Sequence, residues 1–281
     1  MSPAQLRASP RTAGRRRQLR SERISSRQNA RFKFLRDAVA EPRRHGLALA
    51  DGPHLVSACI ESGAKISCLL LSDGGAADSA LAELAGRCRA GKRLVLSEGL
   101  FRELTGVATP TGIAVVFEIP SQPLPDGSGD VILLDAVQDA GNVGAILRTA
   151  AAAGVSEAWL GPGCAGAWTC RVMRAAQGAH FRIGIREQVD PLGAIPADGR
   201  LPVAAVAHGG TELFELDLAG PVLWLFGNEG AGLSATILDT APVQARIPLA
   251  SGVESLNVAA AAAVCMFEAR RQRNRNKAGP R

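Results

Sequence analysis

The sequence predicts an α/β protein whose larger part is a parallel sheet covered by helices on both faces. Short apolar runs alternate with helical patterns along most of the chain. Loops rich in glycine and polar residues follow several of these runs, and we find no internal repeat. The chain has 281 residues, of which 47% are hydrophobic and 21% charged. This composition allows a sizeable core and suits two modest domains.

The front part of the chain, residues 25–119, has the pattern of a small α/β domain. Its expected strands are SCLLL (67–71), RLVLS (93–97) and GIAVVFEI (112–119). Its expected helices cover 27–40, 53–62 and 78–90. The segment IPSQPLPDGSGD that follows holds three Pro, two Gly and two Ser within twelve residues. Because such a composition is typical of a linker, we predict a domain boundary over 120–129.

The second part, residues 130–270, alternates more regularly. Its expected strands are VILLD (131–135), EAWLG (157–161), FRIGI (181–185), VAAVA (203–207), VLWLF (222–226) and VQARI (243–247). One Ala-rich helix is expected over 143–153, with Asn142 as its N-cap and Gly154 at its end. A second Ala-rich helix is expected over 257–267, beginning near Ser255 or Asn257.

Three loops at the carboxyl ends of the expected strands share one composition. They are DAVQDAGN (135–142), GNEGAGLS (227–234) and PLASGVESLN (248–257). Ligands of such sheets bind outside the carboxyl ends of the strands, and glycine lets backbone groups approach a ligand closely. Any one of these loops is explained by an ordinary glycine turn. Three at the same end of the sheet predict a binding site that presents mainly backbone.

The formal net charge of +6 is concentrated at the two ends of the chain. Residues 1–24 carry seven Arg and one Glu, and residues 268–281 carry six basic residues and one Glu. We interpret 1–24 and 271–281 as unstructured tails that suit a polyanion, because cations that neutralise phosphates release counterions. Tails that only improve solubility are the alternative. A further basic cluster predicts a phosphate-binding surface, or alternatively a solvated helix face: Arg27, Arg31, Lys33, Arg36, Arg43 and Arg44.

Composition also argues against several classes of protein. Six cysteines are scattered without a CxxC or a paired His spacing, which favours reduced thiols in the cytoplasm over disulfides or a metal site. The longest apolar run, VAAAAAVCMF, is far shorter than the roughly 20 residues of a membrane helix. The basic start lacks an apolar segment, so no secretory signal is expected, whereas an organellar transit peptide stays open.

One motif favours a different chemistry. GPGCAG (161–166) matches G-x-G-x-x-G after an expected strand, and Glu187 follows at the distance of about 20 residues that a dinucleotide site requires. However, the strand is not the first of its unit, Pro162 stiffens the turn, and AWTC is a poor start for a helix. NAD binding is therefore kept only as a remote alternative.

Three segments carry a family resemblance: NVGAILRTAAAAGV, FGNEGAGLS and IPLASGVESLNVAAAAAV. In order and in the letters N-x-G-x-x-x-R, G-N-E-G and S-L-N, they resemble the motifs of the SpoU, or TrmH-like, class of the SPOUT superfamily. Its members are S-adenosylmethionine-dependent RNA ribose 2′-O-methyltransferases. The resemblance covers roughly residues 130–270. It implies a homodimer with active sites near the subunit interface, and a C-terminal trefoil knot (the SPOUT α/β-knot), an exception to the rule that chains do not thread themselves.

The front part resembles the small RNA-binding domain that often precedes this fold and is itself similar to ribosomal-protein domains. The resemblance rests on ISSRQNARFKFLRDA and LALADGPHLVSACIESG, with Asp51-Gly52 where the family usually has Glu-Gly. It makes the basic cluster between Arg27 and Arg44 a candidate RNA-binding surface, and it favours ribosomal RNA over tRNA. Aromatic residues are only 4% of the chain and Tyr is absent, so a base-stacking platform is not apparent.

The resemblance also implies roles for individual residues. Contacts to the cofactor are implied for Gly227, Glu229, Gly230, Ile247, Leu256 and Asn257. Catalysis and substrate orientation are implied for Asn142, Arg148, Glu229, Ser255 and Asn257. The structural alternatives are a surface Arg for Arg148, a carboxylate at a helix N-terminus for Glu229, and helix caps for Ser255 and Asn257.

Arg148 has been viewed in this family as the base, which is chemically awkward because a guanidinium stays protonated and has no acceptor. We interpret Arg148 instead as a clamp on an RNA phosphate, with that phosphate or a water assisting proton removal. A sulfonium methyl is already a good electrophile, so the enzyme mainly has to hold it in line with the ribose oxygen.

The sequence therefore predicts a cytoplasmic enzyme that methylates a ribose 2′-hydroxyl of RNA, most simply of ribosomal RNA. Two alternatives stay open: a non-catalytic RNA-binding relative acting in ribosome assembly, and the NAD-dependent oxidoreductase. The particular RNA and nucleotide are not determined by the sequence.

Overall fold

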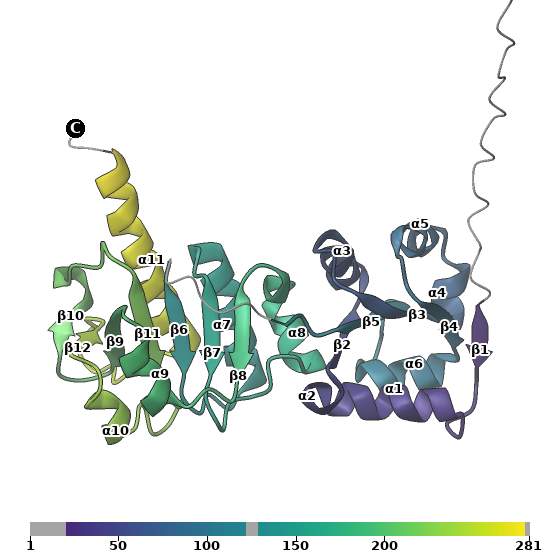
Figure 1. The fold of residues 1–281 in the computed structure, drawn as a ribbon, viewed down its shortest axis with the longest axis horizontal. Coiled ribbons are helices and arrows are strands. Elements are labelled where there is room, and N and C mark those ends of the chain that lie inside the picture. Colours follow the sequence, from purple (N-terminus) through teal and green to yellow (C-terminus); the bar gives the residue numbers. More distant parts are fainter. Residues whose placement is uncertain (1–20, 122–128, 279–281) are drawn as a thin grey trace, which may run out of the picture.

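Two α/β units lie side by side in the structure, a computed structural model that describes residues 21–121 and 129–278 (Figure 1). We call them the front domain (21–121) and the C-terminal domain (129–278). Most of the expected tail 1–24 and most of the expected linker 120–129 lie outside the described residues. The end of that expected tail is structured, because Glu22–Ile24 forms strand β1 and Ile24 is buried.

The front domain has a mixed sheet in the order β1-β4-β3-β5-β2, in which β5 runs antiparallel to both of its neighbours. Its strands are β1 Glu22–Ile24, β2 Leu47–Asp51, β3 Ile66–Ser72, β4 Lys92–Leu96 and β5 Ile113–Glu118. Its helices are α1 Ala30–Ala40, α2 Pro42–His45, α3 Pro53–Glu61, α4 Asp73–Ala77, α5 Ser79–Arg87 and α6 Glu98–Thr105. The predicted strands and helices are all found, whereas β1, β2, α2, α4 and α6 were not predicted.

The C-terminal domain has a parallel sheet in the order β10-β12-β9-β11-β6-β7-β8. Its strands are β6 Val131–Leu134, β7 Glu157–Leu160, β8 Gly184–Glu187, β9 Leu201–Val206, β10 Thr211–Glu212, β11 Val222–Phe226 and β12 Val243–Arg246. Its helices are α7 Ala140–Ala153, α8 Cys170–Ala176, α9 Pro191–Ala197, α10 Ala235–Leu238 and α11 Val258–Ala278, with 3-10 turns η1 Ala179–Phe181 and η2 Leu213–Glu215. Every residue of β6 and β11 is buried, as expected of strands covered on both faces. The predicted α/β class is confirmed.

The strand predicted at 181–185 is wrong in its start. Phe181 ends the 3-10 turn η1, and the strand begins only at Gly184. The Phe181 ring lies 5.4 Å from the ring of Phe117 in the front domain. Its hydrophobic side chain is therefore used for packing between the domains and not in the sheet.

The predicted N-cap of α7 is also wrong. Asp139 is the N-cap, and its carboxylate accepts a hydrogen bond from the backbone N–H of Asn142. Two residues with good capping side chains stand three apart, and the earlier one caps the helix. The side chain of Asn142 is thereby left available for other contacts. The predicted end at Gly154 is confirmed, with a φ of 81° that suits glycine.

The last helix extends beyond the predicted end at 267. Helix α11 runs to Ala278, so the segment interpreted as a C-terminal tail is helical over 271–278. Arg273 donates two hydrogen bonds, of 2.8 and 2.6 Å, to the buried carboxylate of Asp130 at the start of β6. Gln272 adds bonds to the backbone of Leu216 and Leu218. These contacts hold the basic segment against the sheet.

Replacing Arg273 with Ala is expected to lower the free energy of unfolding by about 2–3 kcal/mol, less than the cost of breaking a fully buried ion pair because Arg273 is partly exposed. The Asp130 carboxylate would lose both bonds from Arg273 and keep its bond from the Val222 N–H. Urea denaturation measures the loss, and Arg275→Ala on the same helix is the control, with a change within about 0.5 kcal/mol. Equal stability of the two variants would show that the pair does not hold the helix.

The two domains share part of their core. Helix α8 lies between the sheets (Figure 1), and the Trp168 ring just before it is 6.2 Å from Phe117 of β5. Arg174 on α8 donates a 3.1 Å hydrogen bond to the Thr105 carbonyl and lies 3.9 Å from the carboxylate of Asp51. Asp51, where the family usually has Glu, therefore faces a cation of the other domain.

Candidate active site

A cavity of about 710 Å³ lies at the carboxyl ends of β9, β11 and β12. Both later glycine loops line it, and so do the residues that lead into α11. All six positions with an implied cofactor contact are among its lining residues: Gly227, Glu229, Gly230, Ile247, Leu256 and Asn257. The structure thus brings together residues that come from two separate loops.

The loop 227–232 folds back on itself as a narrow hairpin. Asn228 and Gly232 exchange backbone hydrogen bonds of 3.0 and 2.9 Å, and the Asn228 side chain accepts from the N–H groups of Gly230 and Ala231. A Cβ on Gly227 would overlap the backbone of Gly232 and Leu233. Glycine at 227 is therefore required by the hairpin itself.

Gly230 has a different reason to be glycine. A Cβ built there would have the Asn228 Oδ1 at 3.6 Å as its nearest neighbour, which is ordinary contact, and its φ is not positive. The protein therefore has room for a side chain at 230, at a position that lines the cavity. An absent side chain in such a place leaves space for a ligand.

A chain of three polar side chains links the cavity to α7. The Asn257 amide donates to the Asn142 Oδ1 at 2.9 Å, and the Asn142 amide donates to the Glu229 Oε1 at 2.9 Å. Asn257 also caps α11, because its Oδ1 accepts from the N–H groups of Ala259 and Ala260. This cap orients the Asn257 amide so that its NH₂ group faces Asn142. The capping role and the site role are therefore compatible.

Glu229 is held by several donors. Besides Asn142, the backbone N–H groups of Gln138 and Asp139 donate to its carboxylate at 3.3 Å. Burial acts to raise the pKa of Glu229, but the hydrogen bonds from Asn142 and from backbone N–H groups outweigh it and lower the pKa below its ordinary value. The group is thus an anionic acceptor that ties the loop after β6 to the loop after β11.

Arg148 does not join this cluster. It follows Asn142 by six residues on α7, which places it roughly 120° away around the helix axis. It lines a separate groove together with residues of α3 and of the segment after α8, among them His54 and Gln177. Ser255, by contrast, lines the cavity with an exposed side chain. Within one chain, four of the five candidate catalytic residues lie together and Arg148 lies elsewhere.

The candidate RNA-binding cluster is partly neutralised by carboxylates. Arg27 and Arg36 lie 2.6 and 3.6 Å from Glu103, Arg44 lies 3.1 Å from Glu41, and Arg31 pairs with Glu22. Such exposed pairs contribute little and exchange readily for another anion. Within the described ranges, Lys33 and Arg43 have no ion pair. The cluster thus includes both solvated pairs and free cations.

Part of the cavity wall was not predicted from the sequence. Residues 205–208 lie at the carboxyl end of β9, the strand beside β11, and line the cavity. The rule that ligands bind at carboxyl strand ends would have included them, but their sequence AVAH has no glycine, and the two glycines that follow it do not line the cavity.

The GPGCAG loop is occupied with contacts inside the protein. Ala165 donates to the Val137 carbonyl at 2.9 Å, and Ala167 donates to the Glu187 carboxylate at 2.8 Å. No long helix begins at the loop, since α8 starts only at Cys170. A dinucleotide fingerprint requires a helix N-terminus directed at the phosphates, so this loop gives no support to NAD binding.

The part of the chain that the structure describes offers neither a metal-binding cluster nor a membrane-spanning helix. It contains no group of three or more His, Cys, Asp or Glu that could hold a metal ion. None of its helices is long and apolar enough to cross a membrane. The six cysteines are all free thiols.

Known proteins resemble this chain in the C-terminal domain, and some of them resemble it over both domains. The model of the SpoU rRNA Methylase family matches residues 130–267. The chain is 34% identical to the Bacillus subtilis 23S rRNA (guanosine(2553)-2′-O)-methyltransferase RlmP, over 79% of the chain and 88% of that protein. It is 32% identical to the 23S rRNA (guanosine-2′-O-)-methyltransferase RlmB of Xylella fastidiosa, over 79% and 95%.

Solved structures agree over both domains. The SpoU methyltransferase AviRb from Streptomyces viridochromogenes in complex with AdoMet matches with a TM-score of 0.79 and 28% identity, covering 88% of this chain and 99% of that one. The AdoMet-bound rRNA methyltransferase from Sinorhizobium meliloti matches with a TM-score of 0.77 and 30% identity, covering 89% and 98%.

Proposed function

The chain belongs to the SpoU rRNA methylase family and is an S-adenosylmethionine-dependent RNA ribose 2′-O-methyltransferase, and from this premise we propose that its substrate is a guanosine of 23S rRNA. The observation that carries the proposal is the cavity at the sheet end, closed on one side by the Asn257–Asn142–Glu229 chain. Guanosine is proposed because the curated relatives act on guanosines of 23S rRNA.

The cavity residues fit the cofactor. Its volume of about 710 Å³ lies within the range of pockets that enclose small molecules. Backbone groups of Gly227 and Gly230 would hold the polar parts, and Ile247 and Leu256, which is 38% exposed, would cover the apolar parts. When bound, S-adenosylmethionine supplies the methyl group as an activated electrophile.

The polar chain acts by orientation. The Glu229 carboxylate accepts three hydrogen bonds and has a lowered pKa, so it is a weak base. We assign to it the task of fixing the Asn142 amide, and to Asn142, Ser255 and Asn257 the task of holding the ribose beside the methyl donor. The proton of the 2′-hydroxyl then passes to the RNA phosphate or to a water, so no side chain has to act as the base.

Arg148 needs a second copy of the chain to reach such a site. In one copy it faces the groove beside α3, away from Asn142. The family resemblance implies active sites near a homodimer interface, and the Ala-rich helices α7 and α11 pack on each other with Phe267 of α11 45% exposed. We therefore propose a homodimer in which Arg148 of one copy clamps the RNA phosphate at the cavity of the other.

We also propose that the enzyme works in the cytoplasm, where a bacterial ribosome is assembled. Support comes from bacterial relatives that act on 23S rRNA.

Replacing Gly230 with Val is expected to weaken S-adenosylmethionine binding roughly ten-fold or more, because the new side chain fills space that the ligand needs. Isothermal titration calorimetry measures the affinity. Gly220→Val is the matched control, since Gly220 has open space around it and lies outside the cavity. Unchanged affinity in a folded Gly230→Val protein would remove this loop from the cofactor site.

The function is tested by transfer of a tritiated methyl group from S-adenosylmethionine to 23S rRNA, followed by nuclease mapping of the labelled nucleotide. Label on the 2′-oxygen of one guanosine is the expected result. RNA binding without label would favour the non-catalytic relative. Label on another nucleotide or another RNA would overturn the proposed substrate and leave the enzyme class intact.

A further inference from the structure

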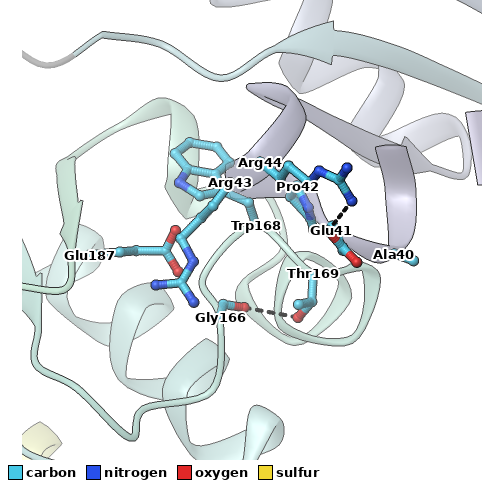
Figure 2. Close-up of a pocket in the computed structure, with 9 residues that line it drawn as sticks. All are labelled: Ala40, Glu41, Pro42, Arg43, Arg44, Gly166, Trp168, Thr169 and Glu187. Atoms are coloured by element: carbon cyan, nitrogen blue, oxygen red, sulfur yellow. Dashed lines mark hydrogen bonds and ion pairs between the residues drawn. The ribbon is translucent and has the colours of Figure 1, made fainter. Parts of the chain in front are cut away.

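A second pocket, of about 380 Å³, lies where the two domains meet (Figure 2). We call it the interdomain pocket. The front domain contributes Arg43 and Arg44 of α2, and the C-terminal domain contributes Trp168, Thr169 and Glu187. It shares no lining residue with the cofactor cavity. Figure 2 shows Arg43 and Glu187 directed toward the same part of the pocket.

The two charges in this pocket do not form an ion pair. Over the ranges that the structure describes, neither Arg43 nor Glu187 has an oppositely charged partner within salt-bridge distance. One oxygen of Glu187 accepts from the Ala167 N–H at 2.8 Å. Burial raises the pKa of Glu187, and the Ala167 N–H and the nearby Arg43 charge only partly offset it. A half-buried carboxylate facing an unpaired guanidinium across a cavity has unused capacity to accept hydrogen bonds.

Trp168 adds a donor to the wall. It is only 3% exposed, and its ring packs 5.0 Å from His180 and 6.2 Å from Phe117. The indole N–H has no acceptor among the described residues, and Figure 2 shows the nitrogen on the side of the ring nearer Glu187. An indole nitrogen can only donate. The second carboxylate of the pocket, Glu41, is paired with Arg44. The pocket therefore combines N–H donors on Arg43 and Trp168 with the carboxylate of Glu187, which has no ion pair among the described residues.

We propose that the interdomain pocket binds a guanine base of the RNA substrate, an inference that rests on the proposed function. Guanine presents two adjacent donors, N1–H and the N2 amine, beside the O6 acceptor. The Glu187 carboxylate accepts from the two donors, and Arg43 or Trp168 donates to O6. Adenine, cytosine and uracil lack two adjacent donors on this edge, so the pocket reads guanine specifically.

The base belongs to a nucleotide other than the methylated one. Glu187 is the last residue of β8, so the interdomain pocket lies at the carboxyl ends of the parallel strands, as the cofactor cavity does. Two loops lie between the sites: Gln138 donates to Glu229 at the catalytic cluster, and Ala165 of the second loop donates to Val137. One RNA strand that lies along the carboxyl ends of the strands can therefore place one nucleotide at Asn142 and the base of another nucleotide in the interdomain pocket.

Interference mapping tests the proposal. Transcribed 23S rRNA carrying randomly placed inosine phosphorothioates is bound to the full chain, and bound and unbound RNA are separated and cleaved with iodine. Inosine lacks the N2 amine of guanine. We expect inosine at one or more unmethylated guanosines to be depleted from RNA bound by the wild type. In Glu187→Gln, which keeps an acceptor for the Ala167 N–H, this depletion is expected to disappear.

Affinity gives a second measurement. Glu187→Gln and Arg43→Met are expected to raise the Kd for RNA roughly ten-fold, within the discrimination that one well-placed base contact provides. Arg36→Met removes one cation of the same surface outside the pocket, and its Kd should rise only about two-fold. The affinity for S-adenosylmethionine should stay unchanged in all three, which excludes a general loss of structure.

Two outcomes would overturn the proposal that this pocket binds guanine. One is an identical inosine pattern for the wild type and Glu187→Gln. The other is depletion that also occurs with guanosine phosphorothioate, since that result places a phosphate and not a base in the pocket. The selection depends on binding alone, so it can be read even if no methyl group is transferred. Methylation that persists without Glu187-dependent interference would reject this inference and leave the proposed function standing.

Discussion

Replacing Arg148 with Ala is expected to lower the rate of methyl transfer by about 100-fold or more, while the affinity for S-adenosylmethionine stays unchanged. The reason is that Arg148 lies away from the cofactor cavity of its own chain and acts, in our proposal, on an RNA phosphate in a second copy. A misplaced substrate costs this much even when all reacting groups are present. Single-turnover methylation of 23S rRNA measures the rate, and calorimetry measures cofactor binding.

The Lys variant separates a clamp from a base. Lysine keeps the charge but loses the planar fork that grips two phosphate oxygens, so Arg148→Lys should retain a small part of the rate with no recovery at high pH. A lysine that acted as base would instead regain activity as the pH rises toward its pKa. A pH–rate profile that climbs to the wild-type rate in alkali would contradict the clamp.

Replacing Asn142 with Ala is expected to lower the rate at least as much, because both hydrogen bonds of the polar chain are lost at once. Asn257 loses its 2.9 Å acceptor, and Glu229 loses the Asn142 donor while the backbone N–H groups of Gln138 and Asp139, at 3.3 Å, remain. Gln138→Ala is a suitable control, since Gln138 contacts Glu229 through its backbone N–H only. If Asn142→Ala kept the rate of this control, Asn142 would have no part in orienting the ribose.

The two inactive variants also test the homodimer. When Arg148→Ala and Asn142→Ala chains are mixed and allowed to exchange, a mixed dimer holds one site with Asn142 from one copy and Arg148 from the other. Random exchange between such symmetric copies should restore about a quarter of the wild-type rate. If both residues acted from the same chain, no mixed dimer would contain an intact site and the mixture would stay inactive.

Much of the fold could be predicted from the sequence because the signals are local. The strand VLWLF is found at Val222–Phe226 as expected, since a short, wholly apolar run is stable only when buried on both faces. Gly154 ends α7 because its positive φ is costly for other residues. Two of the three predicted loops line one cavity, because parallel strands bring their carboxyl ends together, and the third loop meets it through the bond from Asn142 to Glu229.

Other features were decided only by contacts between distant parts of the chain. Asn142 has a side chain suited to capping a helix, but Asp139 caps α7. The Asn142 amide forms hydrogen bonds with Glu229 and Asn257 from other loops. The basic end of the chain is helical, and Arg273 on this helix donates to the buried carboxylate of Asp130 at the start of β6.

The interdomain pocket shows the same limit. From the sequence, Arg43 is interpreted as one of several surface cations. Glu187 is interpreted as part of a dinucleotide motif that the structure does not support. The packing of α8 between the domains brings them to one pocket beside Trp168. Local propensity follows from neighbouring residues, so the sequence alone determined the class of fold and pointed to two of the loops that line the larger cavity. The partners of a polar side chain depend on which distant segment is packed against it, and this only the tertiary structure decided.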